Sequence, residues 1–125
     1  MKILIVDDSP DLLNILHWSL KRCGYSCETA YYREGLIRNI STTVPALILM
    51  DVNLDADDGR QLCLELKQNP ATKTIPVILC SARHELLQNF KSFLADDYIE
   101  KPFEMKLLVS KIEKLLKLST HKLTS

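Results

Sequence analysis

The chain has 125 residues, and its sixteen lysines and arginines are balanced by sixteen aspartates and glutamates. This length fits one domain, which on folding buries roughly two-thirds of the surface that the unfolded chain exposes. With no net charge, the domain alone is not expected to bind nucleic acid, and its apolar runs are too short to cross a membrane.

Five short runs rich in strand-forming residues alternate with segments of helical periodicity. The first run, residues 2–6, precedes a helix that begins with Ser9 and Pro10 in the favoured cap and first-turn positions and ends near Gly24. The other strands are predicted at residues 26–30, 46–50, 76–81 and 97–100. The other helices are predicted at residues 33–41, 59–68 and 84–94, with a last helix after Pro102.

This alternation predicts the fold class. The first, third and fourth strands are almost continuously apolar, which is typical of central parallel strands covered by helices on both faces. A strand and a helix repeated five times predict an open, doubly wound α/β sandwich. The two common strand orders both place the first strand centrally, and ligands of such sheets bind beyond the carboxyl ends of the strands.

Polar residues stand at those carboxyl ends. Asp7 and Asp8 follow the first strand, Asp51 ends the third, Ser81 ends the fourth, and Lys101 follows the fifth. Taken singly, they are typical of helix caps, turns and solvated surface charges. Taken together, three carboxylates at adjacent strand ends repel one another unless a cation lies among them. Hard oxygen ligands with open positions suit Mg²⁺, so the sequence predicts a magnesium site.

The chain also carries four cysteines, Cys23, Cys27, Cys63 and Cys80, and none of them forms a CxxC pair. We expect all four to be reduced and without a redox role. No signal peptide is predicted, because acidic residues directly follow the first apolar run, and we expect a cytoplasmic protein.

The residues at the strand ends stand in motifs that resemble the response-regulator receiver domain of two-component signalling. The motifs are LIVDDSP at 4–10, LILMD at 47–51, DG at 58–59, Ser81 followed by Ala82, and DYIEKPF at 97–103. The resemblance covers about residues 1–118 and leaves a short polar tail at residues 119–125. It implies a flavodoxin-like (βα)5 sandwich with a parallel sheet of order 2-1-3-4-5.

The resemblance also implies the chemistry of the site. Asp51 is expected to take a phosphoryl group from a phosphohistidine of a sensor histidine kinase or of a phosphotransfer protein. Magnesium is expected on Asp8, Asp51 and the backbone carbonyl of Asn53, with Asp7 supporting it through water. Such a domain is not a conventional enzyme, because it catalyses its own phosphorylation and dephosphorylation. A cis peptide bond before Pro102 is implied as well.

Further residues receive roles by the same resemblance. Ser81 and Lys101 are expected to bind the phosphoryl group. Ser81 and Tyr98 are expected to form a switch that alters the face of the fourth helix, fifth strand and fifth helix, where a downstream protein would dock. The plainer interpretation of Tyr98 is a half-buried strand aromatic that does not move. Asn53 and Arg83 occupy positions that influence the lifetime of the phosphate.

Three positions depart from the family pattern. Asp55 stands where proline is usual and Asp57 where an apolar residue is usual, so the loop after Asp51 is expected to be more acidic and more mobile. Leu94 stands where a glycine often ends the fourth helix, so that end is expected to lack the left-handed cap.

Four other functions fit the sequence less well. A calcium loop starting at Asp51 would place Ala56 at the glycine position and Leu62 at the bidentate glutamate. A haloacid-dehalogenase-like phosphatase requires an aspartate where Asn53 stands. A receiver-shaped interaction module that is never phosphorylated usually lacks the acids or the lysine, which this chain keeps. A nucleotide-binding flavodoxin-like protein would need a glycine-rich phosphate loop, and the three glycines form none.

Overall fold

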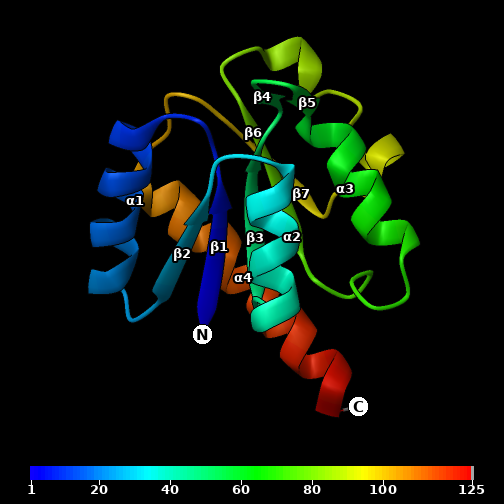
Figure 1. Ribbon diagram of the computed structural model, residues 1–125. Coiled ribbons are helices and arrows are strands. Elements are labelled where there is room, and N and C mark those ends of the chain that lie inside the picture. Colours follow the sequence, from blue (N-terminus) through cyan, green and yellow to red (C-terminus); the bar gives the residue numbers. More distant parts are fainter. Residues whose placement is uncertain (125) are drawn as a thin grey trace.

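A sheet of five parallel strands forms the centre of the computed structural model (Figure 1). The structure describes residues 1–124, and for residues 119–124 it describes the backbone alone. The strands are β1 (Lys2–Val6), β2 (Ser26–Ala30), β3 (Leu47–Asp51), β6 (Val77–Ser81) and β7 (Asp97–Glu100). Their order across the sheet is β2-β1-β3-β6-β7, so the predicted order 2-1-3-4-5 is confirmed.

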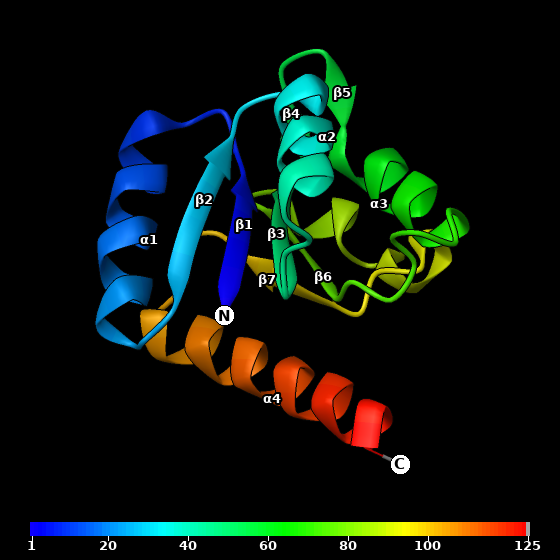
Figure 2. The ribbon, with the colours of Figure 1, turned by 60° about the horizontal axis from the view of Figure 1, so that its bottom comes forward.

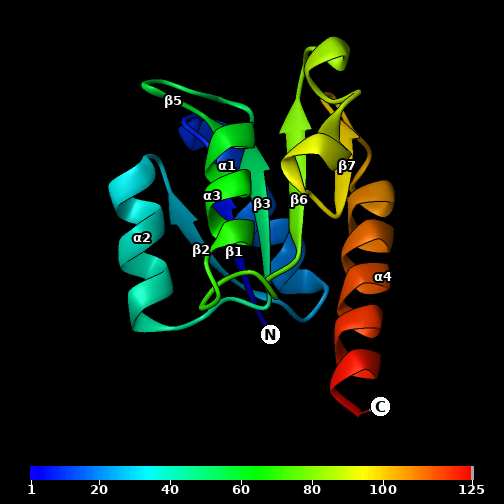
Figure 3. The same ribbon diagram turned by 90° about the vertical axis from the view of Figure 1, so that its right-hand side faces the viewer.

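Helices cover both faces of this sheet. One face carries α1 (Pro10–Arg22) and α4 (Met105–Thr124), and the other carries α2 (Arg33–Thr42) and α3 (Gly59–Gln68) (Figures 2 and 3). Two hydrophobic clusters, one on each face, attach these helices to the strands. The predicted doubly wound α/β sandwich is therefore confirmed.

The burial of the strands follows their composition. Every residue of β3 and β6 is buried, and in β1 only Lys2 is not, because these strands lie between two helical layers. The edge strand β2 reads SCETA and is fully buried only at Ala30. Strands this apolar are stable only inside the sheet, so the sequence determines which strands are central.

Helix α1 begins and ends where its sequence predicts. The Ser9 hydroxyl accepts a hydrogen bond from the backbone N–H of Leu12 at 3.4 Å, and Pro10 occupies the first turn. After the helix, the N–H of Gly24 donates to the carbonyl of Lys21, and Gly24 has φ 92°, a left-handed conformation that glycine adopts without strain.

The predicted fourth helix is wrong. Residues 84–94 instead form two 3₁₀ turns, η1 (His84–Leu86) and η2 (Phe90–Phe93). Apolar side chains at Leu87, Phe90 and Phe93 recur every three residues, which is the period of a 3₁₀ helix. Asn89, a poor helix former, stands between the two turns. The sequence pattern located the segment but not its kind of helix.

Leu94 ends this segment in a left-handed conformation with φ 62°, although it is not a glycine. The expected lack of a left-handed cap is therefore wrong. The N–H of Leu94 donates to the carbonyl of Lys91, and the N–H of Ala95 donates to the carbonyl of Phe90. These two hydrogen bonds hold Leu94 in a conformation that costs a side-chain-bearing residue roughly 1–2 kcal/mol.

The structure also bears on the predictions about one peptide bond, the cysteines and the end of the chain. The peptide bond between Lys101 and Pro102 is cis, as predicted. All four cysteines are free, and burial raises the pKa of Cys63 and of Cys80 to about 12, so both stay protonated. Helix α4 continues to Thr124, whereas the side chains of the predicted tail, residues 119–125, lie outside the described part. Within the described residues, no helix combines the length and apolar character that a membrane span requires.

The left-handed conformation of Leu94 predicts an unusual order of stabilities. Leu94→Gly should be more stable than Leu94→Ala by about 0.5–1 kcal/mol, because both remove the side chain but only glycine relieves the strain. At Leu107, equally half-exposed but in the first turn of α4, Ala should be more stable than Gly by about 0.5–1 kcal/mol. Urea unfolding of the four variants measures both differences. The same order at both positions would contradict the strained conformation of Leu94.

Candidate functional site

Three aspartates meet at the carboxyl edge of the sheet. Asp7 and Asp8 follow β1, and Asp51 ends the adjacent strand β3. One carboxylate oxygen from each lies within 4.8 Å of the others. Asp7 and Asp51 are buried, with 3% and 6% of their surfaces exposed, whereas Asp8 is open to solvent. The structure thus brings together the carboxylates that the sequence predicted to converge.

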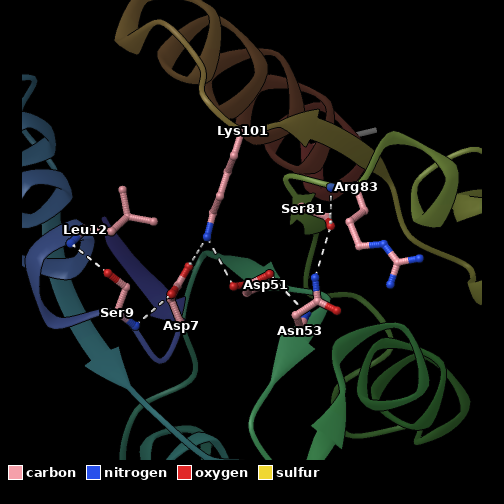
Figure 4. Close-up of polar contacts among 8 residues, drawn as sticks. All are labelled: Asp7, Ser9, Leu12, Asp51, Asn53, Ser81, Arg83 and Lys101. Carbon is pink, nitrogen blue, oxygen red and sulfur yellow. Dashed lines mark hydrogen bonds and ion pairs between the residues drawn. The ribbon is translucent and has the colours of Figure 1, made fainter.

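The ammonium group of Lys101 lies between two of these carboxylates (Figure 4). Its Nζ donates to Oδ2 of Asp7 at 2.8 Å and to Oδ2 of Asp51 at 3.1 Å. The backbone N–H of Lys101 donates to the carbonyl of Ser81 at 2.8 Å, which ties the end of β7 to the end of β6. Lys101 is therefore directed into the acidic cluster by the sheet itself.

Burial and charge act against each other at Asp51. Burial raises the pKa of its carboxyl, while the N–H of Asn53, 3.0 Å from Oδ1, and the charge of Lys101 oppose the rise. Burial lowers the pKa of Lys101, but its hydrogen bond to Asp7 and the charges of Asp51 and Asp7 outweigh this, so its pKa is raised. One ammonium facing three carboxylates leaves negative charge uncompensated, and these hard oxygen donors fit a divalent cation such as Mg²⁺.

Ser81 lies on the other side of Asp51 from Asp7 (Figure 4). Its hydroxyl oxygen accepts hydrogen bonds from the backbone N–H of Arg83 at 3.0 Å and from the Asn53 amide at 3.4 Å. Because both contacts use the oxygen as acceptor, the hydroxyl proton stays available for a donor role toward a group bound at Asp51. The side chain of Arg83 turns away from Asp51, and its Nε donates to Glu85 at 2.9 Å.

The acidic loop after Asp51 forms a small hairpin. Strands β4 (Asn53–Leu54) and β5 (Asp57–Asp58) pair in antiparallel fashion, with Asn53 opposite Asp58 and Leu54 opposite Asp57. The hairpin borders a depression of about 600 Å³ that is also lined by Asp8, Arg83 and Leu86. The loop after Asp51 is therefore a paired hairpin, while its expected greater mobility stays a prediction.

The hairpin ends at Gly59, which lies against the backbone of β3. A Cβ atom added to Gly59 would lie 2.0 Å from the carbonyl oxygen of Asp51 and 2.9 Å from its carbonyl carbon. The N–H of Gly59 also donates to the carbonyl of Val52 at 2.8 Å. Only glycine permits this approach, which brings the start of α3 directly beside Asp51.

Comparison of this chain with known proteins identifies its family. The sequence model of the response regulator receiver domain matches residues 3–113. The chain belongs to this family. It is 32% identical over 120 residues to the alkaline phosphatase synthesis transcriptional regulatory protein PhoP of Bacillus subtilis, covering 94% of this chain and 49% of that protein. The chain thus spans about half the length of this relative.

Solved structures agree with the assignment. The signal receiver domain of a signal transduction histidine kinase from Syntrophus aciditrophicus has a TM-score of 0.82 and 36% identity, covering 93% of this chain and 89% of that one. A two-component response regulator from Clostridium difficile has a TM-score of 0.85 and 28% identity, covering 94% and 96%. Phosphorelay is the function of this family, and receiver domains generally bind Mg²⁺ in an acidic pocket.

In this receiver domain Tyr98 is half-buried on β7. Its ring packs against Phe90, with ring centroids 4.9 Å apart, and Lys111 Nζ lies 5.1 Å from its ring centre. Tyr98 pairs with Leu79 on β6, two residues before Ser81, so the side chains of Leu79 and Ser81 share one face of the strand. The structure therefore places Tyr98 beside Leu79, on the strand that ends at Ser81.

Sequence reasoning missed the charged contacts that hold the hairpin. Asp58 caps α3 by accepting from the N–H of Arg60 at 2.9 Å, and the Arg60 guanidinium pairs with the same carboxylate at 2.8 Å. Arg33 at the start of α2 contacts Asp57 at 3.3 Å and Glu65 at 3.0 Å. The cap was visible in the sequence as Asp58 before a helical pattern, but the partners of Arg33 were not.

The close approach at Gly59 predicts a large effect of one methyl group. Gly59→Ala should destabilise the domain by about 1–3 kcal/mol, because the contacting atoms belong to the backbone of Asp51 and cannot rotate away. Gly35→Ala, in α2, is the matched control, since its nearest neighbour is a Cβ at 3.3 Å, and it should change stability by less than about 1 kcal/mol. Urea unfolding measures both; equal stability of the two variants would contradict the approach.

The Asp58–Arg60 pair predicts a pH-dependent contribution. The hydrogen bond from the Arg60 side chain lowers the pKa of Asp58, so its stabilisation is present above the ordinary aspartate pKa and is lost as pH falls through the lowered value. Asp58→Asn keeps a capping oxygen but loses the charge, and should cost about 0.5 kcal/mol at pH 7 and nothing once Asp58 is protonated.

Urea unfolding from pH 7 downward measures this difference. Asp55→Asn is the control, because Asp55 is exposed and makes no ion pair within the described residues. A cost of Asp58→Asn that stays constant at all pH values would show that shape rather than charge matters.

Proposed function

We propose that Asp51 accepts a phosphoryl group from a phosphohistidine of a sensor histidine kinase or of a phosphotransfer protein. The observation that carries this proposal is the convergence of Lys101 and three carboxylates at the carboxyl edge of the sheet, where β1, β3 and β7 end. Asp51 is the buried carboxylate at the end of β3, and it lies between the Lys101 ammonium and the Ser81 hydroxyl (Figure 4). The two groups that would bind phosphoryl oxygens thus flank the acceptor.

The reaction is a transfer between two nucleophiles. A carboxylate oxygen of Asp51 attacks the phosphorus, and the bond from phosphorus to the histidine nitrogen breaks. That nitrogen keeps the electron pair and takes a proton, which leaves neutral histidine and an acyl phosphate on Asp51. Water later attacks the phosphorus, releases inorganic phosphate and regenerates the carboxylate. In this way the domain catalyses its own phosphorylation and dephosphorylation.

The residues at the carboxyl edge of the sheet have different proposed roles. Asp8, Asp51 and the backbone carbonyl of Asn53 are the proposed Mg²⁺ ligands, with Asp7 supporting the ion through water. When bound, Mg²⁺ supplies positive charge for the phosphoryl oxygens. Lys101 lies 3.1 Å from Asp51 and neutralises a further part of that charge.

Two other groups act on the phosphoryl oxygens and on water. The Ser81 hydroxyl, which has its proton available, donates to a phosphoryl oxygen. Asn53 and Arg83 line the same depression as Asp8, next to the end of β3, which supports their proposed effect on phosphate lifetime. Arg83 now pairs with Glu85, so it would have to leave that partner to touch the phosphate.

The proposed signal starts with Ser81. A phosphoryl group on Asp51 gives its hydroxyl a new acceptor, and a move toward that acceptor exchanges its contact with Asn53. Tyr98 would then turn into the space behind Ser81. The ring starts half-buried between Phe90 and Lys111, so both of these contacts change when it moves.

The proposed output face consists of the segment 84–94, β7 and α4. A groove of about 610 Å³ lies on it, lined by Tyr98, Glu100, Phe103, Leu107 and Lys111 among others. Because Tyr98 lines this groove, its movement would change the shape that a downstream protein contacts. We therefore propose that the output partner docks over this groove.

The proposal is tested by phosphorylation. With a small phosphodonor and Mg²⁺, the wild type should acquire a base-labile phosphate and Asp51→Asn should acquire none, as measured by intact mass. Asp55→Asn is the matched control, because it removes a carboxylate that lines the same depression without touching the acceptor, and it should be labelled like the wild type. Equal labelling of wild type and Asp51→Asn would place the acceptor elsewhere.

A further inference from the structure

Arg33 connects three separate elements on the side of the hairpin that faces α2 and α3. It is the first residue of α2, and its NH1 and NH2 donate to the two carboxylate oxygens of Glu65 on α3 at 3.2 and 3.0 Å. Its Nε donates to Oδ1 of Asp57 on β5 at 3.3 Å. The guanidinium therefore braces the hairpin against two helices, and Figures 1 and 3 show the hairpin at the upper ends of α2 and α3.

The strand that Arg33 contacts is the one that pairs with Asn53. Asp57 lies opposite Leu54 and Asp58 lies opposite Asn53, so β5 determines where β4 lies. Two-residue strands have little stability of their own, and a hairpin of this size depends on its anchors. Leu54, which is buried in the core, anchors one strand, and Arg33 anchors the other together with the Asp58–Arg60 pair.

We propose that Arg33 is a positioning residue for the divalent-cation site: through Asp57 it sets the position of the hairpin and hence the direction of the Asn53 carbonyl. The inference rests on the proposed function, because that function makes the Asn53 carbonyl a ligand. It also accounts for Asp57, which stands where an apolar residue is usual in the family and here is the partner of Arg33.

The chemistry of the side chain supports this role. A guanidinium is a rigid planar fork that binds one carboxylate with two nitrogens and still directs its Nε elsewhere, which an ammonium group cannot do. The three side chains are 25–46% exposed, so the pairs contribute little to global stability. Their effect is therefore local and falls on the hairpin.

Simple electrostatics predicts the opposite result, which makes the inference easy to test. Arg33 is a positive charge near a cation site, so removing it makes the site more negative and should tighten cation binding. Loss of positioning should weaken it instead. The sign of the change distinguishes the two.

The experiment is a calorimetric titration of the full chain with Mg²⁺ alone. Arg33→Gln should weaken Mg²⁺ binding about three- to tenfold, somewhat less than the loss typical of a direct outer-shell partner. Arg38→Gln is the matched control, because Arg38 lies exposed on the same helix and makes no ion pair within the described residues, and it should bind Mg²⁺ as the wild type does or slightly more tightly. Unchanged or tighter binding by Arg33→Gln would overturn the inference.

Two further measurements keep the test decisive. Arg33→Lys retains the charge but not the fork, so it should also weaken Mg²⁺ binding. This variant replaces Arg33→Gln in the test if Arg33→Gln does not fold. Wild-type Mg²⁺ affinity of Arg33→Lys would overturn the inference. Amide NMR shifts of residues 53–58 without Mg²⁺ should change in Arg33→Gln and not in Arg38→Gln. If the wild type itself shows no saturable Mg²⁺ binding, the proposed cation site fails, and the inference fails with it.

Discussion

The contact of one ammonium group with two buried carboxylates is the constraint on which this receiver domain depends. Lys101 lies between Asp7 and Asp51, and it leaves part of their charge, and all of that of Asp8, without a cation. Carboxylates crowded in this way persist only if the backbone that carries them cannot move apart. Strands β1 and β3, buried on both faces and paired with each other, provide that rigidity.

The rest of the edge is built around the same buried carboxylate. The N–H of Asn53 donates to Asp51, the Asn53 amide donates to Ser81, and the backbone of Lys101 donates to the carbonyl of Ser81. Gly59 brings the start of α3 against the carbonyl of Asp51. A change at any of these positions therefore reaches Asp51 through a short series of bonded groups, although the residues come from β3, β4, β6, α3 and the segment after β7.

Much of this arrangement is readable from the sequence, for a physical reason. Apolar strands in a parallel sheet must end at a common edge, so residues such as Asp51 and Lys101 are brought together by the fold alone. The contacts of Arg33 are different, because its partners lie 24 and 32 residues away on other elements and leave no local pattern. The helix predicted over residues 84–94 failed because the apolar pattern there fits two helical periods, and burial of Leu87 and Phe90 with three-residue spacing decided between them.

The two 3₁₀ turns of residues 84–94 determine how easily this segment can rearrange. An α-helix moves as a cooperative rod, since each of its hydrogen bonds supports the next. Short 3₁₀ turns have poorer hydrogen-bond geometry and break independently, so this segment can rearrange piece by piece at low cost. Because it lies between Ser81 and the strand that carries Tyr98, it is a compliant connection between the acidic edge and a side chain that lines the groove of β7 and α4.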